Sequence, residues 1–448
     1  MWRGTCILDG RLRISVPFTK TTLANGLEVI VHEDRRVPLA AVNVWYHVGS
    51  RNEVRGRTGL AHLFEHLMFE GSAHQGEGYF GPLQQAGASL NGSTSTDRTN
   101  YWEVVPTGAL ELALWMEADR MGWLLPALSQ ERLDNQRGVV LNERRQSYEN
   151  RPYGLAQFTL MDALYPFEHP YSWPTIGEPA DLEATSLDDV RGFFARHYHP
   201  GNASLTVAGD VNTADVLKQV ERLFGEIPVG PAVPAVTAPT PEPRHRRLVL
   251  RDRVELPRLY LSWHSPSLFA EGDAELDLAA DVVANGRTSR LYSRLIHERR
   301  LAVELAAGQT SRELGGTFQV VASAAPGHTL DELESAIREE LDRFIADGPT
   351  ADELERGRVQ AEAAFVFRLQ SVGGFGGKAD QLNAYNVYRN SPDGFADDLE
   401  RYLSATPASL RDAAGRWLSG ESPVVLAVVP EGSQEGLRDA EWVKGGHA

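Results

Sequence analysis

The sequence predicts an α+β fold built from two similar halves that are joined by a proline-rich linker. Prolines recur through residues 228–247, where large apolar residues are few, and this composition is typical of an extended connection. The segments on either side, 1–227 and 248–448, are similar in length and carry similar patterns in the same order. Short strand patterns mixed with longer helical patterns are typical of helices packed on a mostly antiparallel sheet.

Each half contains the same succession of expected elements. A strand comes first, an apolar helical stretch follows, and the half ends with helices and a further strand. The expected strand, helix and final strand are 39–48, 59–69 and 203–209 in the first half, and 259–264, 274–283 and 423–429 in the second. We therefore interpret the chain as an internal duplication.

Composition limits the class of protein. With 448 residues, of which 42% are hydrophobic and 23% charged, the chain has the balance of an ordinary globular protein of two or three domains. A net charge of −17 argues against a nucleic-acid partner. Cys6 is the only cysteine in the sequence, so no internal disulfide is expected.

The sequence also bears on location. No apolar run approaches the roughly 18 residues that a membrane span needs, so no span is expected. The N-terminus lacks a continuous apolar stretch of the kind found in signal peptides, which predicts a cytoplasmic protein. A misassigned start codon would hide such a stretch, and a periplasmic location would then follow.

The most specific feature of the chain is the run His62-Leu63-Phe64-Glu65-His66. On a helix the two histidines are four residues apart, so both imidazoles project from one face. Two neutral imidazoles at this spacing can share one Zn²⁺, and the carboxylate of Glu65 can reach a water on the metal. The run is the reverse of His-Glu-x-x-His and matches the signature of the inverted zincins.

The alternative interpretation of this run is an amphipathic helix with two surface histidines. The flanking segments 59–61 and 67–69 are apolar, so we expect the helix to be buried on most sides. Polar side chains on a buried helix need partners, because unpaired buried polar groups are costly. This argument favours a metal site.

A third metal ligand is expected, because catalytic zinc usually has three protein ligands and a water. The segment from Gln130 to Tyr148, rich in Glu, Arg, Leu and Gln, predicts a second helix. Glu143 in this segment is the candidate ligand.

These motifs resemble the pitrilysin/insulinase family of zinc peptidases. The resemblance is carried by the His-x-x-Glu-His run, by Glu143 at the separation found in that family, and by Asn-Gly-Ser-Thr-Ser-Thr-Asp-Arg-Thr-Asn-Tyr at 91–101. It extends over nearly the whole chain and is closest to the catalytic subunits of two-chain bacterial members and of mitochondrial processing peptidase. It implies two homologous halves that form a clamshell around a chamber.

The resemblance implies a role for each residue of the motif. His62, His66 and Glu143 would bind Zn²⁺, and Glu65 would activate a zinc-bound water as general base. The family implies hydrolysis of extended peptides, whereas the ligands alone imply only metal-assisted hydrolysis. Many relatives carry another glutamate where this sequence has Gln136, whose amide would still hydrogen-bond around the metal site, so metal binding should survive.

A substrate-binding strand is implied next to the motif. In the resembled family an edge strand here pairs with the backbone of the substrate, which implies that Asn91, Gly92 and Ser93 bind substrate. From the residues alone, 89–96 is equally compatible with a loop rich in Ser and Thr. The segment 100–105 is a plausible strand.

A partner is implied by what the second half lacks. Relatives often carry an Arg and a Tyr seven residues apart that contact substrate near the zinc. Ile296 and Val303 occupy these positions here, although Arg299 or Arg300 would substitute if the alignment shifts. The resemblance therefore implies a homologous, metal-free subunit that supplies the pair, or otherwise a homodimer.

Two other functions stay open: a non-catalytic structural or assembly subunit of the same fold, and a zinc hydrolase of non-peptide substrates. The second half carries no metal motif, since Asp277-Leu278-Ala279-Ala280-Asp281 stands at the matching place. This absence suggests that the duplication kept the fold and lost the metal in the second half.

Several other features predict no catalytic role. Residues 373–378 resemble a phosphate-binding loop only superficially, because Ala379 follows where Ser or Thr would be needed, and we expect a flexible connection between helices. Surface or hydrogen-bonded positions are expected for His169, His197 and His199. The segment 431–448 is expected to be a loose tail.

Overall fold

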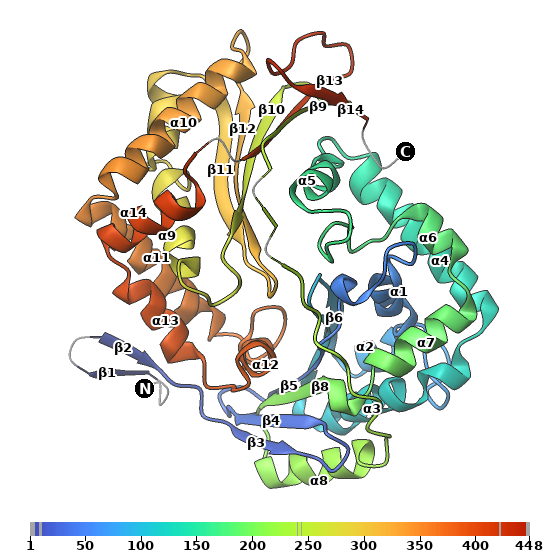
Figure 1. Cartoon of the computed structure of the whole chain (residues 1–448). Helices are drawn as coiled ribbons and strands as arrows, with labels where there is room; N and C mark the ends of the chain where they lie inside the picture. Colours follow the sequence, from blue (N-terminus) through green and yellow to red (C-terminus); the bar gives the residue numbers. More distant parts are fainter. Residues whose placement is uncertain (1–4, 9–10, 240, 243, 421–422, 445–448) are drawn as a thin grey trace. The chain divides into compact units, whose positions relative to one another are not determined.

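The computed structural model describes the whole chain apart from residues 1–4, 9–10, 240, 243, 421–422 and 445–448. It contains two compact units (Figure 1), and each has one six-stranded sheet with helices. The predicted α+β class is confirmed. Unit 1 comprises Met1–Leu141, Pro174–Val236 and Ala364–Asp398, and unit 2 comprises Asn142–Trp173, Thr237–Ala363 and Leu399–Ala448.

The compact units exchange two segments between the predicted halves. Residues 142–173 precede the proline-rich segment 228–247 but belong to unit 2, and residues 364–398 follow it but belong to unit 1. The sequence boundary therefore separates the two series of duplicated elements, whereas each compact unit needs chain from both sides of that boundary.

The sheet of unit 1 has the strand order β3-β4-β8-β5-β7-β6. Its strands are β3 (Thr19–Thr22), β4 (Glu28–Glu33), β5 (Leu39–Tyr46), β6 (Ser89–Thr94), β7 (Thr99–Pro106) and β8 (Ala203–Gly209). Neighbouring strands are antiparallel except for β4 and β8, which run parallel. Strand β6 forms one edge of this sheet.

The sheet of unit 2 has the order β11-β12-β10-β13-β9-β14. Its strands are β9 (Arg246–Asp252), β10 (Arg258–Ser265), β11 (Ala302–Thr310), β12 (Gly316–Ala324), β13 (Val424–Pro430) and β14 (Glu441–Val443). Strand β9 is parallel to both of its neighbours, and the remaining pairs are antiparallel. A separate hairpin joins β1 (Thr5–Leu8) to β2 (Arg11–Ile14).

The two sheets confirm the predicted duplication. In each sheet one late strand, β8 or β13, is parallel to one neighbour, β4 or β9, and antiparallel to the other, β5 or β10. The strands β6 and β7, or β11 and β12, complete the sheet on the side of β5 or β10. Helix α1 (Leu60–Leu67) follows β5 in unit 1, and α9 (Asp273–Val283) follows β10 in unit 2. Helix α9 therefore holds the topological place of α1.

Helices cover both faces of the unit 2 sheet. Figure 1 shows α9, α10, α11 and α14 along one face, where Leu261, Phe318 and Phe344 belong to one apolar core. Helix α5 lies on the other face, in a second core with Leu248 and Leu426. These helices are α5 (Ala156–Leu164), α10 (Leu330–Asp347), α11 (Ala351–Arg368) and α14 (Pro407–Trp417).

The helices of unit 1 include one from the second half of the sequence. They are α2 (Phe80–Gln85), α3 (Leu110–Ala127), α4 (Gln130–Arg144), α6 (Pro179–Ala184), α7 (Leu187–His197), α8 (Thr213–Phe224) and α12 (Lys378–Arg389). Helix α12 contacts β5 and β8. Three helices cross a boundary between the units: α4 and α11 near their C-terminal ends, and α13 (Phe395–Ser404).

The expectation of a loose C-terminal tail can be compared with the structure. Strand β14 pairs with β9, and Leu437 is buried, so the prediction of a loose tail from residue 431 is wrong for this part. The cause is a short strand that the polar composition of the segment conceals.

Among the described residues, no helix has the length and apolar character that crossing a bilayer requires.

Helix α9 shows what has replaced the metal motif in the second half. It carries Asp277 and Asp281 four residues apart, the spacing of the two histidines in α1. The Tyr402 hydroxyl donates a hydrogen bond of 2.7 Å to Asp277 Oδ2. Burial raises the pKa of Asp277 from its ordinary 3.8 to about 7. A partly buried, hydrogen-bonded carboxyl group therefore stands where unit 1 has an imidazole.

We predict that Asp277→Asn stabilises the chain at pH 8. The folded chain holds this proton up to about pH 7, whereas the unfolded chain releases it near pH 3.8. The contribution of this carboxyl to stability is therefore complete below about pH 4 and is lost as the pH rises through about 7. The free energy of unfolding should fall by roughly 2 to 4 kcal/mol over this range. We expect the Tm of the wild type to fall between pH 5 and pH 8 and the Tm of Asp277→Asn to fall much less.

The matched control is Asp342→Asn, which removes an exposed carboxylate on α10. This control should keep the wild-type dependence of Tm on pH. An Asp277→Asn variant with the wild-type dependence would contradict the assignment.

Candidate metal centre

The first turn of α1 is fixed by a buried carboxylate. Glu53, which is 5% exposed, accepts hydrogen bonds from the backbone N–H groups of Gly59 at 2.9 Å and Ala61 at 2.8 Å. An anion is favourable at a helix N-terminus because the first N–H groups have no partner within the helix. Gly59 has φ of 89°, and a side chain here would collide with Gly177, so the entry to α1 requires glycine.

The apolar face of α1 fixes its position in unit 1. Leu63, Phe64 and Leu67 are buried. The Phe64 ring lies 5.8 Å from Phe193 and 5.1 Å from Tyr198, measured between ring centroids. The histidines and Glu65, on the opposite face, are only half buried. The pattern of apolar flanks around the motif therefore aims its polar side chains away from the core.

The two histidines of the motif lie side by side as their spacing predicts. The ring centroids of His62 and His66 are 4.8 Å apart, and the rings are inclined at 73°. Each can offer one neutral nitrogen to a shared ion.

Glu143 joins the two histidines from a second helix. It lies in the last turn of α4, which is one continuous helix from Gln130. One ligand atom each from His62, His66 and Glu143 lie within 4.8 Å of one another, and this is the one such group among the residues that the structure describes. In tetrahedral zinc sites the ligand atoms are roughly 3.4 Å apart, with bonds of about 2.1 Å. Two nitrogens and one oxygen at this spread fit zinc with a fourth position open.

Glu65 is held toward the neighbouring edge strand. The hydroxyl of Thr94, at the end of β6, donates a hydrogen bond of 2.7 Å to Glu65 Oε2. This bond restricts the rotation of the carboxylate. Glu65 therefore links α1, which carries the candidate metal ligands His62 and His66, to the strand expected to bind substrate.

The candidate substrate-binding residues lie on an edge strand. Asn91, Gly92 and Ser93 belong to β6, which pairs with β7 only, so the alternative of a loop at 89–94 is excluded. A side chain at Gly92 would come within 3.0 Å of both Phe69 and Tyr101. The Gly92 N–H donates to the Asn91 side chain at 2.8 Å, so the strand ladder does not use it. The backbone of β6 therefore offers hydrogen-bonding groups at the open edge of the sheet.

Gln136 has a defined partner near α1. Its amide donates a hydrogen bond to Glu70, which follows the C-terminal end of α1, and its side chain is mostly buried. The contact joins α4 to the segment after α1. The role of Gln136 around the metal site stays a prediction. If Gln136 has this role, it would act through its hydrogen bond to Glu70.

Sequence reasoning missed a buried ionic cluster next to α1. Arg120, fully buried, pairs with Glu117 and, at 3.3 Å, with Glu103. Its guanidinium also lies 4.0 Å from the ring centroid of Tyr101 and 5.4 Å from that of Phe69. Burial and the neighbouring Glu117 raise the pKa of Glu103 well above its ordinary value. The periodicity of α3 gives no signal of this cluster, because charged residues on a helix usually indicate a solvent-facing side.

His169 and His199 are hydrogen-bonded, as predicted, whereas His197 is buried with its ring centroid 4.7 Å from that of Phe193. His169 Nδ1 accepts a hydrogen bond from Tyr171 N at 3.0 Å, and His199 Nε2 lies 3.1 Å from Arg196 O. Burial lowers the pKa of His169 and His197 to about 4. These side chains are therefore neutral at pH 7.

The glycine-rich segment 373–377 packs against the unit 1 sheet. A side chain at Gly373 would meet Ala41 and Val104, and Lys378 forms a buried ion pair with Asp34. In unit 2, Ile296 lies in the π-helical turn Tyr292–Glu298, and Val303 is an exposed residue of β11.

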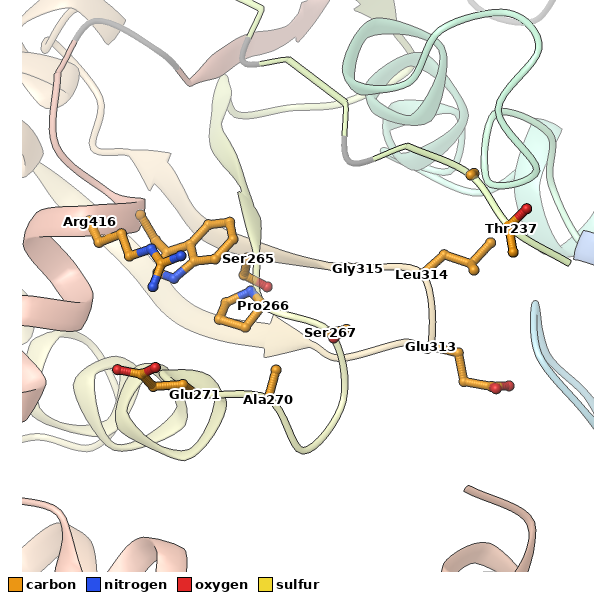
Figure 2. Close-up of a pocket in the computed structure, with 12 residues that line it drawn as sticks. Thr237, Ser265, Pro266, Ser267, Ala270, Glu271, Glu313, Leu314, Gly315 and Arg416 are labelled. Carbon is orange, nitrogen blue, oxygen red and sulfur yellow. The ribbon is translucent and has the colours of Figure 1, made fainter. Parts of the chain in front are cut away.

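A cavity of about 420 Å³ lies in unit 2 at the end of β10 (Figure 2). Arg416, Glu271 and Glu313 all contribute to its lining, so its charge is mixed. It includes none of the candidate site residues, and the candidate metal centre lies elsewhere.

The duplicated α+β sheets and the His-x-x-Glu-His helix with a glutamate from a second helix are features of an inverted zincin. Comparison with known families supports this class. Residues 28–169 match the family model described as insulinase, peptidase family M16, and residues 184–360 match the peptidase M16 inactive domain. The chain belongs to peptidase family M16, and the predicted family is confirmed. The inactive-domain match includes residues 248–360 of the second half, which agrees with the lack of a metal motif there.

Individual relatives give the same result. The chain is 28% identical to the zinc protease PqqE of Helicobacter pylori over 415 residues, which cover 91% of this chain and 92% of the relative. It is 29% identical to the mitochondrial-processing peptidase subunit beta of Caenorhabditis elegans over 245 residues, 54% of this chain and 51% of that protein. A crystal structure of a protease from Helicobacter pylori superimposes with a TM-score of 0.84 at 27% identity, covering 92% and 99% of the two chains. At the family level these relatives support a zinc metallopeptidase.

We predict that His66→Ala abolishes stoichiometric zinc binding. Two remaining ligands leave the ion under-coordinated, so most of the affinity should be lost. Elemental analysis of the purified variant measures this directly. The matched control is His297→Ala, which removes an exposed imidazole in unit 2 and should leave zinc content at wild type. One zinc per chain in His66→Ala would refute the ligand assignment.

Proposed function

We propose that this chain is a zinc-dependent peptidase that hydrolyses extended peptides. The observation that carries the proposal is the convergence of His62, His66 and Glu143 beside an open edge strand. An ion-binding donor set alone supports metal-assisted hydrolysis of many substrates. The adjacent strand edge, which suits a peptide backbone, favours peptides over other substrates.

Glu65 and Thr94 have different roles in the proposed hydrolysis. When bound, zinc polarises the scissile carbonyl and lowers the pKa of a water molecule. Glu65 accepts the proton from the attacking water and delivers it to the nitrogen of the leaving amine. Thr94 keeps the Glu65 carboxylate oriented through its hydrogen bond. Because a carboxylate ligand leaves the metal less electrophilic than a third histidine would, Glu65 carries much of the activation.

Strand β6 holds the peptide in register. An extended peptide would add to the sheet beside Asn91, Gly92 and Ser93 and would use the outward backbone groups of the strand. In the free chain the Asn91 side chain satisfies the Gly92 N–H, so this side chain moves aside when a peptide binds. Side chains of the peptide would alternate between the two faces of the sheet.

The absence of an Arg/Tyr pair favours a second subunit. Ile296 and Val303 stand at the two positions, and neither can donate a hydrogen bond to a developing oxyanion. We infer that a homologous, metal-free chain supplies this pair, with a homodimer as the second possibility. The name of one relative, the beta subunit of a mitochondrial peptidase, supports a paired arrangement in the family. Structural or assembly subunits of the same fold remain the competing function, and the intact donor set argues against them.

We predict that Glu65→Gln keeps zinc and the fold but loses hydrolysis. The amide can still accept the hydrogen bond from Thr94, but it cannot take a proton from water. Loss of a general base typically costs about 10²- to 10⁴-fold in rate. Peptide turnover by the zinc-loaded variant is the measurement, with Glu77→Gln as the control because Glu77 is exposed in the same unit. Turnover by Glu65→Gln near the wild-type rate would show that Glu65 is not the base.

We predict that the purified chain alone is weakly active and gains activity with a metal-free homologue. Support of a developing oxyanion is often worth about 10²- to 10³-fold, so the partner should raise kcat more than it lowers KM. The double variant Ile296→Arg with Val303→Tyr should restore part of this activity. Peptide hydrolysis is measured together with mass by light scattering. Full activity from a monomer or homodimer would contradict a division of labour between two chains.

A further inference from the structure

Helix α12 is bound to the sheet of unit 1 through polar side chains. Asn383 donates hydrogen bonds of 2.9 Å to the backbone and side-chain oxygens of Asn43 and accepts one of 2.8 Å from Thr206. Lys378 pairs with Asp34 at the start of the helix. Most helices are held on a sheet by apolar contacts, so polar contacts at this one suggest that individual side chains have specific tasks.

Asp380, in the first turn of α12, is a convergence point for donors from several strands. Its Oδ1 accepts hydrogen bonds from Trp45 Nε1 at 2.8 Å and Asn100 Nδ2 at 2.9 Å, and its Oδ2 accepts one from Gly376 N at 2.8 Å. These donors are all neutral. Hydrogen bonds to a carboxylate are stronger than bonds between neutral groups, so Asp380 fixes the side chains that reach it.

The Asn100 side chain connects Asp380 to the edge strand β6. Its Nδ2 donates to Asp380, and its Oδ1 accepts a hydrogen bond of 2.7 Å from the Ser93 hydroxyl. If the amide were turned over, its oxygen would face the Asp380 carboxylate, and the two would repel. The acceptor oxygen of Asp380 therefore determines which end of the fully buried Asn100 amide faces Ser93.

Arg98 closes these contacts into a ring. Its guanidinium donates to the Ser93 hydroxyl at 2.6 Å and to the Ser93 backbone oxygen at 2.8 Å, and it lies 5.3 Å from the Trp45 ring centroid. Trp45 in turn donates to Asp380. Ser93 is thus held on one side by Arg98 and on the other by Asn100.

The position of Ser93 controls the open edge of β6. The turn between β6 and β7 closes with a hydrogen bond from Ser95 N to Arg98 O. Hydrogen-bonded and non-bonded pairs alternate along an antiparallel ladder, so Ser93 and Asn100, which are in register, form a bonded pair. The backbone groups of Gly92 then face the edge. A shift of Ser93 would displace these groups.

We propose that Asp380 is a positioning residue for the peptide-binding edge of β6, acting through Asn100 and Ser93. This inference rests on the proposed function of β6 as a peptide-binding strand. A residue of the second half of the sequence thereby sets the binding geometry beside a metal motif of the first half. Asp380 does not contact the metal ligands or the peptide; it fixes the strand to which the peptide adds.

The test measures peptide binding separately from catalysis. Zinc-loaded Glu65→Gln is titrated with a fluorescent peptide of about ten residues, and the Kd is compared with that of Glu65→Gln carrying Asp380→Ala. Loss of one or two oriented hydrogen bonds should raise Kd about 3- to 10-fold. Asp380→Asn keeps one acceptor oxygen for Trp45 and Asn100 and should stay within about twofold. In the active enzyme, Asp380→Ala should raise KM and leave kcat and zinc content near wild type.

A double-mutant comparison tests whether Asp380 acts through Ser93. If Asp380 acts through Ser93, Asp380→Ala combined with Ser93→Ala should bind peptide no more weakly than the weaker single variant. The matched structural control is Asn383→Ala, which removes contacts of the same helix to β5 and β8 and leaves those of Asp380 in place. It should lower Tm without the change in Kd. Asp393→Ala, an exposed site in the same segment, controls for charge.

The outcomes separate this inference from the proposed function. Unchanged Kd in Asp380→Ala, or an equal increase in Asn383→Ala, overturns the positioning role and leaves the peptidase proposal standing. Additive losses in the double variant also overturn it, because the two residues would then act independently. Failure of zinc-loaded Glu65→Gln to bind extended peptides overturns the peptide-binding role of β6, and the inference falls with it.

Discussion

The immobilisation of α1 is the constraint on which the candidate centre depends. His62 and His66 lie on one helix and Glu143 on another, so the three side chains converge only while α1 keeps its position beside α4. Three separate contacts meet this need: the Glu53 carboxylate at the first turn, the aromatic stack around Phe64 beneath the helix, and the guanidinium of Arg120 near Phe69 after its end. Each acts on a different part of the helix. The ligands on the opposite face are therefore placed by packing before any ion binds.

Features encoded over a few residues could be predicted from the sequence. The spacing of His62 and His66 follows from helix geometry alone, and the strands in 39–48 and 203–209 have strong apolar patterns. Glu143 needed the family resemblance, because helical periodicity does not tell one exposed glutamate from another. The sequence does not distinguish a strand from a loop at β6, because its Ser, Gly and Asn residues have weak strand propensity and pairing with β7 determines its form.

Features that depend on distant contacts could not be predicted. Thr94 reaches Glu65 because α1 packs under β6, and no local pattern records that contact. The exchange of 364–398 into unit 1 rests on side chains such as Asn383 and Asp380, which resemble ordinary polar residues of an exposed helix. The buried Arg120 looks like a surface residue in the sequence for the same reason. The partners of Thr94 and Asp380 lie far along the chain, whereas Arg120 pairs with Glu117 three residues away and is buried by elements that pack around it.

The exchange of segments has a consequence for synthesis of the protein. A chain leaves the ribosome from its N-terminus, and domains usually fold as units in that order. Unit 1 includes α12, which ends at Arg389 of 448 residues. The polar side chains of β5 and β8 that contact α12 therefore stay uncovered until residues 378–389 have been translated. During that interval the nascent protein exposes both a bare sheet face and an open strand edge, which makes it a natural client for chaperones.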